Sequence, residues 1–152
     1  MPLTNVDTRF TVGSTFTLPS VTADAAEMLS FAQAFDPQPI HLSAEAAVAR
    51  GFSGLVASGW YVCGLFMRQF VTHVIAHSSA LVSPGLEQIR WRNPLIAGTA
   101  ITGTATVTKV VPSLSVRGGY IATFEVTLST DDPAHRDVAT LSMHCLFDAN
   151  KE

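Results

Sequence analysis

Hydrophobic and polar positions follow different patterns in the first half and the last third of this chain. Between residues 58 and 77 apolar residues recur at helical spacing, and polar residues collect on one side of the second half, which predicts a long helix. Nearly every position in 60–67 is apolar or small, so we expect these turns to be buried on all sides. After residue 85 the apolar positions alternate with a period of two, which predicts strands at 86–91, 101–111, 120–128 and 138–147.

The N-terminal part mixes a strand-like segment with short helical ones. Evenly spaced apolar positions predict a strand or short hairpin from Phe10 that ends at Pro19. Thr22 is the expected N-cap of a helix running through Ala32, and Ser43 that of a short helix ending at residues 50–51. The chain thus predicts one domain over residues 1–152, an antiparallel sheet of five or six strands with one long helix packed along it.

The composition limits the possible partners. Charged residues make up only 14% of the chain, against about 25% in a usual soluble domain, so we expect a homo-oligomer that hides apolar surface. A net charge of −3 with dispersed basic residues argues against nucleic-acid binding. The apolar stretch 55–67 is shorter than the roughly 20 residues that span a bilayer, so no membrane association is expected. The N-terminus lacks a signal-peptide pattern, and the two cysteines are expected as free thiols, which favours a cytoplasmic location.

The segment 35–47, FDPQPIHLSAEAA, contains the first candidate chemistry. Asp36 and His41 stand five residues apart, and Pro37 and Pro39 stiffen the turn between them, which leaves little room for helix. A carboxylate and an imidazole on one rigid turn can converge on a single water, which suits acid–base catalysis. Without such a role, Asp36 would simply end the preceding helix and His41 would be a strand-end histidine with its hydrogen bonds satisfied.

The segment 51–61, GFSGLVASGWY, contains the second group of residues that could carry chemistry. Ser58 and Gly59 stand where the long helix is expected to begin, and a helix N-terminus presents unpaired N–H groups and a partial positive charge. Gly59 lacks a Cβ, so a ligand oxygen can approach its backbone closely. Alternatively, Ser58 only caps the helix and Gly59 only permits close packing against the sheet.

Together these segments resemble the active-site pattern of the MaoC-like dehydratases, the (R)-specific enoyl-CoA hydratases of the hotdog fold. The matching positions are Asp36, Pro39, Ile40, His41 and Ala47. Phe35 departs from the family's usual glycine and Gln38 from its usual asparagine, which puts the substrate in doubt rather than the chemistry. The likeness spans residues 8–147 and implies an α+β hotdog fold, a long central helix wrapped by five to six antiparallel strands, assembled as a homodimer.

The resemblance also implies an activity in fatty acid metabolism, the interconversion of trans-2-enoyl and (R)-3-hydroxyacyl thioesters of CoA or a carrier protein. Asp36 and His41 would activate the water and the Gly59 amide would stabilise the enolate. The reaction would need no metal and no redox cofactor, because the thioester is the substrate. Candidate substrate-binding residues are Ser58, Phe35, Gln38, Trp60, Arg90 and Arg92.

Several alternatives remain beside this interpretation. Trp60 falls at helical spacing with other aromatic residues and is expected in the core rather than in a ligand site. Arg90 and Arg92 either meet a CoA phosphate or line a solvated strand face. A hotdog thioesterase and a non-catalytic acyl-thioester-binding subunit are rival functions, which the intact motif disfavours. His73 and His77 lack the glutamate of a zinc-binding helix motif and are expected to be surface residues.

Overall fold

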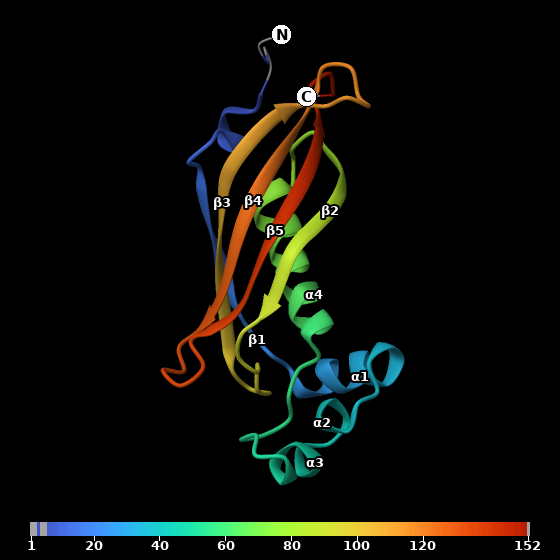
Figure 1. The fold of residues 1–152 in the computed structure, drawn as a ribbon, viewed down its shortest axis with the longest axis vertical. Coiled ribbons are helices and arrows are strands. Elements are labelled where there is room, and N and C mark those ends of the chain that lie inside the picture. The colour runs from blue at the N-terminus through green and yellow to red at the C-terminus, as the bar shows by residue number, and fades with distance from the viewer. Residues whose placement is uncertain (1–2, 4–5, 152) are drawn as a thin grey trace.

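Five antiparallel strands form one sheet in the computed structural model, which describes residue 3 and residues 6–151 (Figure 1). Their spatial order is β1-β3-β4-β5-β2, so β1 and β2 are the edges. The strands are β1 (Thr15–Thr22), β2 (Ala80–Trp91), β3 (Ala100–Pro112), β4 (Gly119–Thr130) and β5 (Asp137–Asp148). The expectation of five or six antiparallel strands is confirmed. The strands extend up to six residues beyond the predicted ones, because ladder hydrogen bonds continue past the segments of clear alternation.

The central helix α4 (Gly59–Phe70) runs along this sheet and continues into a π-helical turn, η2 (Val71–Ile75). Its sheet-facing side is buried in the core, with Phe70 fully buried beside Phe124 of β4 at 5.0 Å between ring centroids. The prediction that its first turns are buried on every side is wrong, because Trp60 is 56% exposed and Gly64 lies at the surface. The sheet covers one side of α4, and the described residues leave the opposite side open.

Three short helices lie beyond one end of the sheet, beside the start of α4 (Figure 1). They are α1 (Ala25–Phe35), α2 (Pro39–Leu42) and α3 (Ala44–Ala49), and we call residues 24–57 the overhang. Ser43 caps α3 as expected, since its Oγ accepts the Ala46 N–H. The expected cap of α1 is wrong: Thr22 ends β1, and Asp24 caps the helix by accepting the Glu27 N–H at 2.8 Å.

The predicted strand or hairpin near the N-terminus also differs. Phe10 belongs to a 3₁₀ turn, η1 (Thr8–Phe10), and β1 continues through Pro19, where its register with β3 shifts. Proline is tolerated there because β1 is an edge strand and the shift leaves no ladder bond for it to break. No helix in the described part of the chain is long and apolar enough to cross a membrane.

Candidate active site

Asp36 stands at the point where α1 ends. Its backbone N–H still donates to the Ala32 carbonyl, but its own φ and ψ of −151° and 69° leave the helix. Gln38 is extended as well, and Pro39 opens the single turn of α2 at the first helical position, where the N–H has no partner within the helix. The proline-stiffened turn therefore contains one short turn of helix, which brings His41 back towards Asp36.

The Asp36 carboxylate is held by two side chains. Gln38 Nε2 donates to its Oδ1 at 2.8 Å, and Ser58 Oγ donates to its Oδ2 at 2.7 Å. These hydrogen bonds, that from Gln38 first and that from Ser58 second, lower the pKa of Asp36 from its ordinary value, although its partial burial opposes them. Asp36 is therefore a carboxylate at neutral pH, with lone pairs left for a further donor.

His41 is oriented by the backbone. Its Nδ1 lies 2.8 Å from the Val56 carbonyl oxygen, and its side chain is only 9% exposed. A carbonyl oxygen can only accept, so Nδ1 carries the proton, and in the neutral ring Nε2 has a free lone pair. That Nε2 lies 3.5 Å from Asp36 Oδ2. The structure thus brings the predicted carboxylate and imidazole together, and the Nε2 atom of His41 faces the Asp36 carboxylate.

Ser58 and Gly59 begin α4 directly beside this pair. Ser58 is the N-cap, its Oγ accepting the Trp60 N–H at 3.3 Å while its hydroxyl proton points to Asp36. Among the described residues no acceptor is found for the Gly59 N–H, the first of the helix. A Cβ at Gly59 would lie 2.5–2.8 Å from the indole of Trp91, so glycine is required for packing here. The missing Cβ of Gly59 thus serves packing against Trp91 of β2, the alternative expected for it, while its N–H is open to a ligand oxygen.

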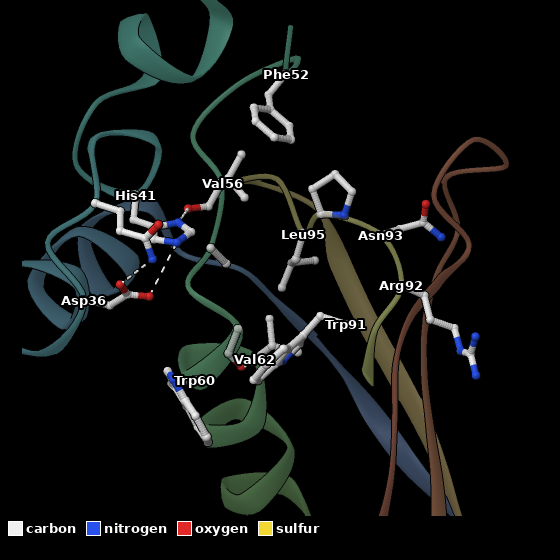
Figure 2. A pocket seen from close by; sticks show the side chains of 14 residues that line it. Asp36, His41, Phe52, Val56, Trp60, Val62, Trp91, Arg92, Asn93 and Leu95 are labelled. Atoms are coloured by element: carbon white, nitrogen blue, oxygen red, sulfur yellow. Dashed lines mark hydrogen bonds and ion pairs between the residues drawn. The ribbon is translucent and has the colours of Figure 1, made fainter. Parts of the chain in front are cut away.

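A cavity of about 400 Å³ joins these groups (Figure 2). Its residues come from the overhang, the start of α4, the last residue of β2 and the segment that follows it. The lining residues are Asp36, Gln38, His41, Phe52, Val56, Ala57, Gly59, Trp60, Val62, Trp91, Arg92, Asn93, Pro94 and Leu95. Four of them are buried and apolar and make up what we call the floor: Val56, Ala57, Val62 and Leu95. The cavity therefore combines a polar wall with an apolar floor.

Three predicted site residues do not line this cavity: Phe35, Ser58 and Arg90. Phe35 is 75% exposed on α1, with its ring 5.3 Å from that of Phe31, and Arg90 is not part of the lining. Ser58 is almost fully buried behind Asp36 and acts on the carboxylate rather than lining the cavity. Arg92 lines the cavity, but its guanidinium points away from Asp36 and His41 (Figure 2).

Trp91 and Leu95 are the main lining residues that the sequence did not indicate. They lie some fifty residues from the Asp36 motif and reach it because Ala57 N–H donates to the Leu95 carbonyl and Val56 bridges to Ile96. The only signal in the sequence was the position of Trp91 between Arg90 and Arg92, at the end of a predicted strand. That pattern does not indicate which segment of the chain lies against the strand end.

Comparisons with known proteins agree with this fold. The profile of the MaoC-like domain family matches residues 7–125. No curated protein sequence matches the chain significantly. A MaoC-like dehydratase from Rhodospirillum rubrum is similar in structure with a TM-score of 0.80, at 30% identity over 91% of this chain and 92% of that one.

More distant solved structures share the same fold. The unliganded R-hydratase PhaJ1 from Pseudomonas aeruginosa has a TM-score of 0.73 at 17% identity, covering 91% of this chain and 82% of that one. The HadBC complex of Mycobacterium tuberculosis, described as a 3R-hydroxyacyl-ACP dehydratase, also gives 0.73, at 20% identity over 94% and 99% of the two chains. The sheet, its central helix and the overhang are thus those of the hotdog fold, and the chain belongs to the MaoC-like domain family.

Proposed function

We propose that this protein is a hydratase and dehydratase that interconverts trans-2-enoyl and (R)-3-hydroxyacyl thioesters. The observation that carries the proposal is the 3.5 Å approach of His41 Nε2 to Asp36 Oδ2 at the wall of a cavity that Gly59 also lines. Family membership supports the dehydratase class. The enoyl thioester itself is taken from the resemblance to the (R)-specific enoyl-CoA hydratases, and the placement of the three groups is compatible with it.

A water at the polar wall meets two acceptors, the Asp36 carboxylate and the His41 Nε2 lone pair. Its two hydrogens point to them, so its oxygen lone pairs face the cavity. During hydration His41 Nε2 takes one proton, the oxygen bonds to C3, and the displaced electron pair moves through C2 to the thioester oxygen. The Gly59 N–H at the helix start stabilises that enolate. Protonated His41 then returns the proton to C2, and dehydration is the same path reversed.

The test is an assay of crotonyl-CoA hydration, followed by the loss of enoyl absorbance. Asp36→Asn and His41→Ala should each lower the rate by about 10²–10⁴-fold, the usual contribution of general acid–base catalysis, while circular dichroism shows an intact fold. Unchanged turnover in folded His41→Ala would contradict the mechanism. Release of free thiol would assign a thioesterase instead, and tight binding without conversion would assign a binding subunit.

We also propose that the protein works as a homodimer with CoA or a carrier protein delivering the acyl group. The open side of α4 and of the η2 turn that continues it presents Trp60 and Val71, which are 56% and 44% exposed. The unpaired edge of β2 presents Val82, which is 61% exposed. A second copy would cover both the apolar helix face and the free edge. Light scattering at micromolar concentration should give twice the chain mass, and a monomer would contradict the proposal. A requirement for a different chain would indicate a heteromer.

A further inference from the structure

Gln38 directly precedes the short helix α2, but its side chain does not serve that helix. It occupies the N-cap position, where serine, threonine, aspartate and asparagine are preferred, and within the described residues its side chain makes no capping hydrogen bond. Instead its Nε2 donates to Asp36 Oδ1 at 2.8 Å, and its backbone N–H donates to the Asp36 carbonyl, also at 2.8 Å. One main-chain and one side-chain hydrogen bond therefore fix Gln38 against Asp36.

The two oxygens of the Asp36 carboxylate are held from different sides. Gln38, from the turn after α1, binds Oδ1, and Ser58, at the start of α4, binds Oδ2 at 2.7 Å. The Cβ–Cγ torsion of an aspartate is soft, so a carboxylate with one bound oxygen can still turn. With both oxygens bound by separate elements, it cannot turn without breaking a hydrogen bond. Gln38 thus sets the rotation of the Asp36 carboxylate.

This rotation leaves Asp36 just short of a direct hydrogen bond to His41. Oδ2 lies 3.5 Å from His41 Nε2 (Figure 2), whereas a bond between an imidazolium and a carboxylate is usually about 2.7–2.9 Å long. The neutral ring has a lone pair at Nε2, which does not attract a carboxylate, so the gap suits a water that donates to both groups. Once His41 is protonated the two groups attract each other, and the hydrogen bonds from Gln38 and Ser58 oppose a closer approach.

The charges around this pair are few. Among the described residues that line the cavity, the third charged one is Arg92, whose guanidinium points away from Asp36 and His41 (Figure 2). The side chains of His41 and Asp36 are only 9% and 16% exposed, so solvent ions screen their interaction little. The distance between these two groups therefore strongly affects the pH at which His41 takes up a proton.

We propose that Gln38 is a positioning residue that keeps the Asp36 carboxylate from closing onto protonated His41. The benefit for catalysis rests on the proposed function, whereas the spacing rests on the geometry alone. Without the Gln38 hydrogen bond the carboxylate turns and bonds directly to His41, which retains its proton and cannot act as the base for hydration. The closer ion pair returns less than the lost bond provided, so ionised Asp36 is still less favoured than with Gln38.

The test is an NMR titration of the His41 ring in Gln38→Met, which keeps the length of the side chain and removes its donor. The midpoint should rise by on the order of one pH unit, the effect of closing this 3.5 Å ion pair to hydrogen-bond distance. The spectrum of His41→Ala identifies the signal among the five histidines. Gln33→Met, the same change at an exposed glutamine of α1 outside the cavity lining, is the matched control and should leave the midpoint unchanged.

The pH profile of crotonyl-CoA hydration separates positioning from a general loosening of the site. In Gln38→Met its acid limb should move to higher pH together with the ring titration, and the alkaline plateau should be retained, because neutral His41 does not draw the carboxylate in. A rate lowered equally at every pH, or an unchanged His41 midpoint, would overturn the proposal. Gln38→Ala gives the same test if the methionine variant does not fold.

A double variant shows whether the effect passes through Asp36. In Asp36→Asn the carboxylate charge is absent, so adding Gln38→Met should no longer move the His41 midpoint. A shift of the same size in that background would also overturn the proposal. A raised midpoint in Gln38→Met, in a protein that hydrates no enoyl-CoA at any pH, would leave this inference standing and remove the proposed function.

Discussion

The sheet and the overhang are built in opposite ways. The sheet has four long antiparallel ladders and a core of fully buried aromatic residues that includes Phe124 and Phe147. The overhang contains helices of 4–11 residues, all of them too short to be stable alone. A few buried residues such as Met28 anchor it to the core, and particular hydrogen bonds fix its polar groups, such as that from Ser58 to Asp36 and that from His41 to the Val56 carbonyl. Most of the buried core therefore lies on the sheet, and the Asp36/His41 pair lies in the overhang, so we expect that the two can be altered separately.

The largest effect should come from the sheet side of this comparison. Phe124→Ala removes a fully buried ring that packs on Phe10, Phe16 and Phe70. We expect a loss of about 3–5 kcal/mol in the free energy of unfolding, as for other buried aromatic truncations. Urea unfolding measures this, and at low temperature the folded fraction should retain its KM. A changed KM in folded protein would show that the sheet core and the site are not separable.

A smaller effect is expected where the two regions meet. Gly59→Ala places a methyl group in the space of the Trp91 indole, so the ring must move and its bond to the Gly59 carbonyl breaks. Overpacking of this kind costs about 1–3 kcal/mol in stability. The double variant Gly59→Ala/Trp91→Ala should lose less than the sum of the single variants, because the clash disappears. Strict additivity in thermal unfolding would contradict the contact.

The tie between α1 and α4 should matter more for rate than for stability. Tyr61 donates to Glu27 Oε1 at 2.7 Å, and Arg68 pairs with the same carboxylate at 3.2 Å. Tyr61→Phe removes one hydrogen bond, worth about 1 kcal/mol, and loosens the helix that ends at Asp36. We expect kcat to fall by up to about tenfold with KM unchanged. Arg68→Gln, at the half-exposed end of this tie, is the matched control and should have a smaller effect.

The smallest effect concerns acid pH. Gln38 is the main cause of the lowered pKa of Asp36, so the stability that this carboxylate contributes is present at neutral pH and lost as pH falls through its folded pKa, below 3.8. Gln38→Leu should move this loss to higher pH, because the carboxylate is then less favoured. Acid unfolding followed by circular dichroism measures the shift. An unchanged acid midpoint would show that the Gln38 hydrogen bond does not hold Asp36 in solution.

The parts of the site that could be predicted are local in sequence. Asp36 and His41 lie five residues apart on one turn, so the local backbone already brings them near each other, before Ser58 and the Val56 carbonyl orient their side chains. The open N–H of Gly59 could be predicted because every helix begins with backbone amides that have no partner within the helix. Trp91 could not, since it arrives through the pairing of β2 with β5 and through the bridge of Val56 to Ile96, both long-range contacts.

The exposure of α4 was missed for a different reason. An all-apolar stretch predicts burial but does not say whether the cover is the same chain or another one, and Trp60 shows that the sheet covers only one side. The cap of α1 was misplaced by two residues, because Thr22 and Asp24 are both good capping residues and the extent of β1 decided between them.

The chain has only two tryptophans, and they touch each other at the same cavity. All indole emission from the native protein thus originates at one place, and a ligand that enters there changes the surroundings of both fluorophores at once. Their edge-to-face contact also couples their electronic transitions, which gives the near-ultraviolet circular dichroism a signal from this spot. Intrinsic fluorescence and near-ultraviolet circular dichroism should therefore report ligand binding in this cavity without an added label.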